Sequence, residues 1–284
     1  MNKRKSWVQQ FEDHFLSQPG EHLIEIGITG SGKTQGLYWV LDGILKNSPD
    51  EVIVWFDSGK SNEILSLARL RPLNVIIPEG TEINITASTQ DIKVTKFKSL
   101  SEIWTKHLDT TGRINIACIE PYVIEPMIYT KAFTKLFGEL IKLAHNYEVP
   151  SPMCIFVDEF HRLAPSKGNA IDAAQMKMGG VLQHNIELLR SLKIRFVCTT
   201  HGWQKIRSGV RNSFNWIMVR RGAHFAADQP KLNRFNPLFE KLTTDESILT
   251  FPTKTFTDVL RLPFYGEGGD MGKIRYLELY DPKK

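Results

Sequence analysis

Short apolar runs alternate along the chain with longer segments of helical period. The runs lie at residues 22–27, 51–56, 74–77, 114–119, 153–157, 194–199 and 216–219, and most lack the apolar/polar alternation of a half-exposed strand. Segments of helical period occupy residues 33–46, 62–70, 101–108, 126–146, 170–192 and 227–235. Continuous apolar strands that alternate with helices are typical of a parallel sheet buried on both faces. The pattern therefore predicts an α/β fold with a mainly parallel central sheet flanked by helices.

Two segments depart from this pattern. Residues 78–98 alternate polar and apolar positions, which is typical of exposed strands, so we expect a small β insertion at the edge of the sheet. From residue 247 the chain reads as two or three strands around a glycine-rich turn, which predicts a β-containing C-terminal extension over 223–284. Repeats and linker-like stretches are absent from the sequence. We therefore expect one domain over residues 1–284, with its core at about 20–222.

Composition and charge narrow the possible partners and compartments of the protein only slightly. The net charge of +5 is compatible with a polyanionic partner, but 36 basic against 31 acidic residues is a mild excess. The three cysteines, Cys118, Cys154 and Cys198, lie inside apolar runs without metal-ligand spacing, so we expect small core residues in a reducing compartment. The N-terminus has no signal-peptide pattern and no apolar run reaches the ~20 residues of a membrane span. These features predict a cytoplasmic protein.

The sequence Gly27–Thr34, GITGSGKT, has the spacing of a phosphate-binding P-loop, or Walker A motif. An apolar strand precedes it and a helical segment follows it, as that motif requires. Its glycines let successive backbone N–H groups face the phosphates, Lys33 reaches the terminal phosphates, and the Thr34 hydroxyl binds Mg²⁺. The predicted nucleotide-binding residues are Gly27, Ile28, Thr29, Gly30, Ser31, Gly32, Lys33, Thr34 and Gln35.

The apolar run at 153–157 ends in two acids, Asp158 and Glu159, as in a Walker B motif. Asp158 is predicted to hold Mg²⁺, and Glu159, which points elsewhere, to orient and deprotonate the attacking water. Two adjacent acids favour hydrolysis over phosphoryl transfer to a small molecule. The chain has no N-K-x-D element to read guanine, so we expect ATP as the nucleotide.

Four stretches resemble the FtsK/HerA superfamily of ring-forming DNA-pumping ATPases, which includes chromosome translocases, conjugation coupling proteins and viral genome-packaging ATPases. They are 54–60 (VWFDSGK), 158–165 (DEFHRLAP), 189–195 (LRSLKIR) and 197–201 (VCTTH). The second is similar to the family form D-E-A-H-x-L-A-P. Lys193 and His201 stand where the family has glycine and glutamine. The resemblance covers about residues 20–222 and implies a RecA-like P-loop ATPase.

The resemblance also implies roles for residues near the nucleotide. Arg190 is then the arginine finger that reaches the γ-phosphate held by the adjacent subunit. Arg220 and Arg221 are a second trans candidate or a solvated strand end. His201 either senses the γ-phosphate or caps the helix that follows it.

The segment 202–212 mixes cationic residues with an aromatic residue, which indicates contact with a nucleic-acid backbone. Lys205, Arg207 and Arg211 are the candidates for phosphate contacts, and Trp203 is predicted either to stack on bases or to belong to the core.

The resemblance implies a homo-oligomeric ring, hexamer or pentamer, that uses ATP and Mg²⁺ to move double-stranded DNA. The compact chain is most similar to a viral genome-packaging ATPase, which would act in the host cytoplasm or the virion beside capsid or membrane proteins. A protein-secretion or phage-extrusion motor that does not act on DNA is the alternative. A regulatory nucleotide-binding module is disfavoured by Glu159.

Overall fold

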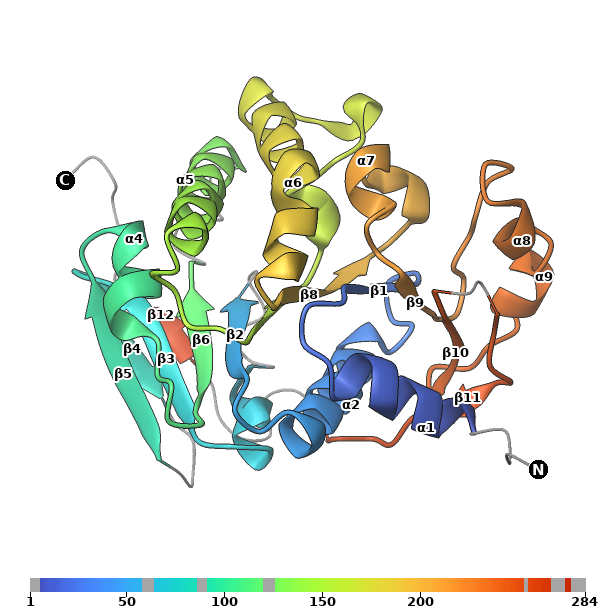
Figure 1. Ribbon diagram of the computed structural model, residues 1–284, viewed down its shortest axis with the longest axis horizontal. Helices are drawn as coiled ribbons and strands as arrows, with labels where there is room; N and C mark the ends of the chain where they lie inside the picture. The colour runs from blue at the N-terminus through green and yellow to red at the C-terminus, as the bar shows by residue number, and fades with distance from the viewer. Residues whose placement is uncertain are drawn as a thin grey trace.

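The computed structural model describes residues 6–57, 64–85, 91–119, 126–252, 255–266 and 274–276. Its centre is a ten-stranded sheet (Figure 1). The order across the sheet is β11 (Leu260–Arg261), β10 (Glu246–Thr250), β9 (Trp216–Val219), β1 (Leu23–Ile26), β8 (Ile194–Thr200), β7 (Met153–Val157), β2 (Val52–Asp57), β6 (Ile114–Cys118), β3 (Leu73–Pro78) and β5 (Ile92–Phe97). The strands from β9 to β5 all pair in parallel, whereas β10 and β11 are antiparallel. The predicted α/β fold with a mainly parallel sheet is confirmed.

Helices cover both faces of this sheet (Figure 1). One face carries α5 (Pro126–His145), α6 (Ala173–Ser191) and α7 (Ser208–Arg211), and the other carries α1 (Trp7–Phe11) and α2 (Lys33–Asn47). Two separate apolar clusters fill the two interfaces. Strands buried on both faces explain the continuous apolar runs of the sequence.

Shorter helical segments connect these elements. They are 3₁₀ turns at Leu65–Arg69, Phe160–Arg162, Lys167–Asn169 and Trp203–Lys205, π turns at Glu12–Leu16 and Ile103–His107, α4 (Leu100–Glu102), α8 (Pro230–Asn233) and α9 (Asn236–Phe239). The predicted helix over 227–235 is confirmed only at α8, which begins at Pro230 and ends at Asn233. A second four-residue helix, α9, follows the predicted range and carries Pro237 in its first turn.

The insertion and the tail take up the two edges of the sheet. β5 pairs with β3 as the outer strand at one edge, and β10 adds to β9 near the other edge. The short strand β4 (Ile83–Ile85) leaves the main sheet and pairs with β12 (Ile274–Tyr276) from the tail. The C-terminal extension therefore returns across the molecule to the insertion.

The cysteines Cys118, Cys154 and Cys198 are all buried, as the sequence predicts. In the part of the chain that the structure describes, the helices are all too short or too polar to cross a membrane.

A buried ion pair fixes the N-terminal segment to the sheet. Arg195 of β8 and Glu51, which precedes β2, are both completely buried, and Arg195 Nε donates to Glu51 Oε1 at 2.7 Å. The same guanidinium donates to the backbone carbonyls of Phe15 and Leu16. One side chain thus joins three segments that are distant in sequence.

We predict that Glu51→Ala lowers the free energy of unfolding by about 3–5 kcal/mol, because it leaves the Arg195 charge buried without a counterion. Urea unfolding followed by circular dichroism measures the loss. Lys46→Ala, which removes an exposed partner of Asp42, is the control and should cost less than about 1 kcal/mol. Equal losses in the two variants would contradict a structural role for the buried pair.

Candidate functional site

The candidate site lies where three neighbouring strands end. β8 stands between β1, which leads into the P-loop, and β7, which leads into Asp158 and Glu159. The carboxyl ends of parallel strands meet at one edge of a sheet, where ligands of open α/β folds bind. His201, directly after β8, is therefore held between Lys33 and Glu159.

The P-loop wraps around its own lysine. Gly32 caps α2 in the left-handed conformation at φ 80°, and Gly30 has φ 71°. The Lys33 ammonium donates to the carbonyls of Gly27 and Ile28 at 2.9 Å each and lies 3.3 Å from His201 Nδ1. The loop therefore holds the Lys33 ammonium at the wall of the cavity.

The two acids of the Walker B motif occupy different environments. The Asp158 carboxylate accepts hydrogen bonds from the Thr199 hydroxyl and from the Glu159 backbone N–H, the latter at 3.0 Å. Glu159 itself has left-handed backbone angles, φ 54° and ψ 44°, which are strained for a residue with a side chain. Its carboxylate pairs with Arg162 Nε at 2.9 Å and with His201 Nε2 at 3.3 Å. Arg162 thus braces Glu159.

His201 links the lysine to the glutamate. Its Nδ1 faces the Lys33 ammonium and its Nε2 faces the Glu159 carboxylate, which fits a neutral ring that carries its proton on Nε2. The His161 ring packs edge-on at 5.6 Å from it. Burial, and nearby cationic groups to a smaller extent, lower the pKa of His161 to about 4, so this neighbour is uncharged at neutral pH.

Arg220 lies beneath the P-loop. Its guanidinium donates to the carbonyls of Ser31 at 3.2 Å, Gly32 at 3.0 Å and Thr244 at 2.6 Å, and it lies 3.3 Å from Glu25 Oε1. The side chains of Arg220 and Glu25 are completely buried. The sequence-based assignment of Arg220 as a trans arginine or a solvated strand end is therefore wrong, because its charge is enclosed in its own subunit.

Burial dominates the electrostatics of this pair. It raises the pKa of Glu25 to about 8, against the opposing attraction of Arg220 and Lys33, and it lowers the pKa of Arg220. A carboxylate inside the apolar run His22–Gly27 was the sequence signal that a buried cation lies opposite. Arg221 keeps a partly exposed position, with its guanidinium 3.4 Å from the Gly30 carbonyl.

These groups line a cavity of about 580 Å³. Its walls include the predicted residues Thr29, Gly30, Gly32, Lys33, Thr34, Gln35, Glu159 and His201, together with Arg220, Thr244, Asp245, Leu262, Pro263 and Phe264. Gly27, Ile28 and Ser31 shape the loop behind that wall. The last five wall residues belong to the C-terminal extension, to which the sequence assigned no role.

The oxygen donors near this cavity fit Mg²⁺. The Thr34 hydroxyl and the Asp158 carboxylate are hard ligands of the kind that this cation takes, together with water and phosphate oxygens. Among the residues described, His, Cys, Asp and Glu do not gather in a group of three that could hold a metal without the nucleotide.

Arg190 lies away from the cavity. It is at the C-terminal end of α6, next to the amino end of β8, and its half-exposed guanidinium pairs with Glu21 and Glu187 at 3.2 Å each. In its own subunit Arg190 therefore lies at the amino ends of the strands, whereas the P-loop lies at their carboxyl ends.

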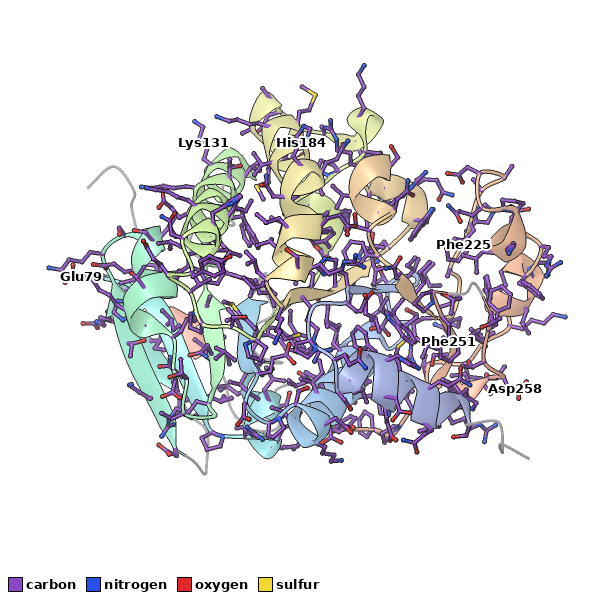
Figure 2. All side chains as sticks on the ribbon, in the orientation of Figure 1. Glu79, Lys131, His184, Phe225, Phe251 and Asp258 are labelled. Atoms are coloured by element: carbon purple, nitrogen blue, oxygen red, sulfur yellow. The ribbon has the colours of Figure 1, made fainter. Side chains whose placement is uncertain are left out.

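The basic segment after His201 presents fewer groups than the sequence indicates. Trp203 is only 2% exposed and packs on Phe225, which Figure 2 labels, at a ring distance of 5.8 Å. Arg211 lies over the same indole at 5.5 Å and pairs with Asp228. Trp203 is therefore a core residue, and the predicted base-stacking role is wrong because the ring has no free face.

Arg207 is also engaged, since its Nε donates to Gln183 of α6 at 2.7 Å. Of the four predicted nucleic-acid residues, Lys205 alone has an exposed side chain.

The stretch 57–60 lies largely outside the described residues, apart from the backbone of Asp57 at the end of β2.

We predict different costs for two glycine substitutions in the P-loop. In both Gly30→Ala and Gly32→Ala the new residue is strained at positive φ, which costs about 1–2 kcal/mol. A Cβ at Gly30 meets no atom within 4 Å, whereas one at Gly32 would overlap the Thr244 carbonyl and the Arg220 guanidinium. Urea unfolding should therefore show a loss for Gly32→Ala at least about 1 kcal/mol larger than for Gly30→Ala. Equal losses would show that Arg220 does not hold the loop closely.

Comparison with known proteins places the fold. No family model matches the chain, and none of the curated proteins matches its sequence. Among solved structures, the genome packaging NTPase B204 from Sulfolobus turreted icosahedral virus 2, in complex with sulfate, superposes with a TM-score of 0.50 at 12% identity, over 87% of this chain and 98% of that one.

Two larger proteins give weaker similarities. The cytoplasmic domain of the type VII secretion ATPase EccC of Thermomonospora curvata has a TM-score of 0.44 at 10% identity, over 87% of this chain and 24% of that one. The pCW3 conjugation coupling protein TcpA has a TM-score of 0.44 at 13% identity, over 87% of this chain and 61% of that one. The chain therefore has a P-loop ATPase fold, similar over almost its whole length to that of the viral genome packaging NTPase B204.

Proposed function

We propose that the protein is an ATP hydrolase of the FtsK/HerA type that moves double-stranded DNA. The observation that carries this proposal is the contact chain Lys33–His201–Glu159 on the wall of the P-loop cavity. A cation, a hydrogen-bonding ring and a carboxylate at one cavity wall are the groups that hydrolysis of a phosphoanhydride needs.

Each group has a separate task in this proposal. Lys33 holds the terminal phosphates, and Glu159 orients the attacking water and takes its proton. His201 holds the Glu159 carboxylate at a fixed position relative to Lys33. The same imidazole ring contacts the γ-phosphate. Thr34 and Asp158 would hold Mg²⁺, which neutralises charge on the phosphates when bound.

The strained backbone at Glu159 connects this chemistry to the surface. The chain after Glu159 runs to Ala164, whose carbonyl accepts from the Arg207 backbone N–H at 2.9 Å, and Ser166 N–H donates to the Lys205 carbonyl at 2.7 Å. A shift of Glu159 during hydrolysis therefore reaches the loop that carries Lys205 through backbone hydrogen bonds.

Three exposed lysines lie on the segments that these contacts bring together, or next to them in sequence: Lys167, Lys177 and Lys205. They belong to the two connected loops and to the start of α6. We propose that they contact DNA phosphates, with Arg207 as support rather than as a direct contact. Lys131 and His184, labelled in Figure 2, lie on the outer side of the same helical layer.

The position of Arg190 supports the proposal of a ring. Arg190 is remote from the cavity of its own subunit and half exposed, so it can act as an arginine finger only on a neighbour. The fold of B204, described as a genome packaging NTPase, supports a packaging role that would involve capsid or membrane proteins in the host cytoplasm or the virion.

We predict that linear duplex DNA stimulates steady-state ATP hydrolysis. Glu159→Gln should reduce the rate about 10²–10⁴-fold through loss of the base, and it serves as the blank. The triple variant Lys167→Ala, Lys177→Ala, Lys205→Ala should lose most of the stimulation, expressed as the ratio of rates with and without duplex. Its response to salt should also be weaker.

The matched control removes three exposed lysines of the far sheet edge, Lys93, Lys96 and Lys98, and should retain the wild-type ratio. ATP hydrolysis that no nucleic acid changes would contradict the DNA-moving function and favour the protein-moving motor.

A further inference from the structure

The nucleotide cavity has an apolar rim that the P-loop does not supply. Leu262, Pro263 and Phe264, directly after β11, form part of the wall together with Thr29, Gly30 and Gln35. A cavity of about 580 Å³ lies within the range of roughly 300–1,000 Å³ that small-molecule sites occupy. The phosphate-binding loop therefore fills only one part of a site large enough for a whole nucleotide.

The segment that carries this rim is anchored on both sides. Gln35, in the first turn of α2, accepts from the Tyr265 backbone N–H at 2.7 Å and donates to the Gly266 carbonyl at 3.0 Å. Before the rim, the Leu262 backbone N–H donates to the Asp245 carbonyl at 2.8 Å. Pro263 and Phe264 are thus held between two fixed points of the backbone.

The side chain of Tyr265 strengthens the second anchor. Its hydroxyl donates to the Asp42 carboxylate of α2 at 3.0 Å, and its ring lies edge-on to Tyr38 at 6.3 Å. Burial, and to a smaller extent the contact with Asp42, raise the pKa of Tyr265 above its usual range, so the phenol remains a donor. The rim is therefore attached to α2, the helix that begins at the P-loop lysine.

Phe264 is exposed at this rim. It is 70% accessible, and every other phenylalanine in the described residues is buried or half-buried. A large apolar ring that is exposed beside the cavity, on a segment whose backbone is anchored on both sides, is suited to a flat apolar ligand surface. A nucleotide has one such surface, its base.

We propose that Phe264 is the base-stacking residue of the nucleotide site, with Pro263 beside it and Gln35 holding both in place. The inference rests on the proposed function, since it assumes that the P-loop binds the phosphates of ATP. Stacking recognises any base by its π-face, so this contact adds affinity without selecting adenine over guanine.

The test compares ATP with inorganic tripolyphosphate, each with Mg²⁺, by isothermal titration calorimetry on the full chain. Phe264→Ala should weaken ATP binding about tenfold, because a base–aromatic stack contributes roughly that factor, and leave tripolyphosphate binding unchanged. Phe264→Trp should restore ATP binding and report it by quenching of the new indole fluorescence. Tyr147→Ala is the control for loss of an exposed aromatic side chain, because Tyr147 is exposed and does not line the cavity.

The outcomes separate this inference from the proposed function. Unchanged ATP affinity in Phe264→Ala would overturn the stacking role, and so would an equal loss of ATP and tripolyphosphate affinity. A wild-type protein that binds both ligands equally tightly would overturn the base contact alone. A wild-type protein that binds neither would refute the proposed function itself.

Discussion

The site depends on the contacts that the Arg220 guanidinium makes beneath the P-loop. The guanidinium donates to two carbonyls of the P-loop and to Thr244 in the C-terminal extension, and it faces the buried carboxylate of Glu25 on β1. Burial raises the pKa of Glu25 and lowers that of Arg220, so it is costly to bury these two ionisable groups together, and the surrounding fold holds each of them in place. The P-loop is thereby connected to β1, β9 and the C-terminal extension through one buried side chain.

The order of the strands places His201 between the P-loop and Glu159. Because β8 lies between the P-loop strand and the Walker B strand, His201 bridges Lys33 and Glu159 by contacts of 3.3 Å on either side of its ring. The turn after Glu159 then bonds to the segment after His201. Nucleotide chemistry and the lysine-bearing loops are therefore connected through backbone hydrogen bonds rather than through flexible side chains.

Some parts of this arrangement can be predicted from the sequence and others cannot. The strands are evident because burial on both faces requires continuous apolar runs, and the loop 27–34 because phosphate binding fixes its spacing. Arg220 was misassigned since local sequence does not reveal that β9 lies beside β1. Trp203 was ambiguous because its burial depends on Phe225 and Arg211, and the Phe264 rim depends on hydrogen bonds between residues more than 200 positions apart.

The central claim is that ATP hydrolysis moves the protein along duplex DNA. Displacement of a triplex-forming oligonucleotide from a linear duplex tests it most directly, because displacement requires translocation and not merely binding. The account predicts displacement with ATP and none with a non-hydrolysable analogue or with Glu159→Gln. Sustained ATP hydrolysis on the same duplex without displacement of the third strand would contradict it.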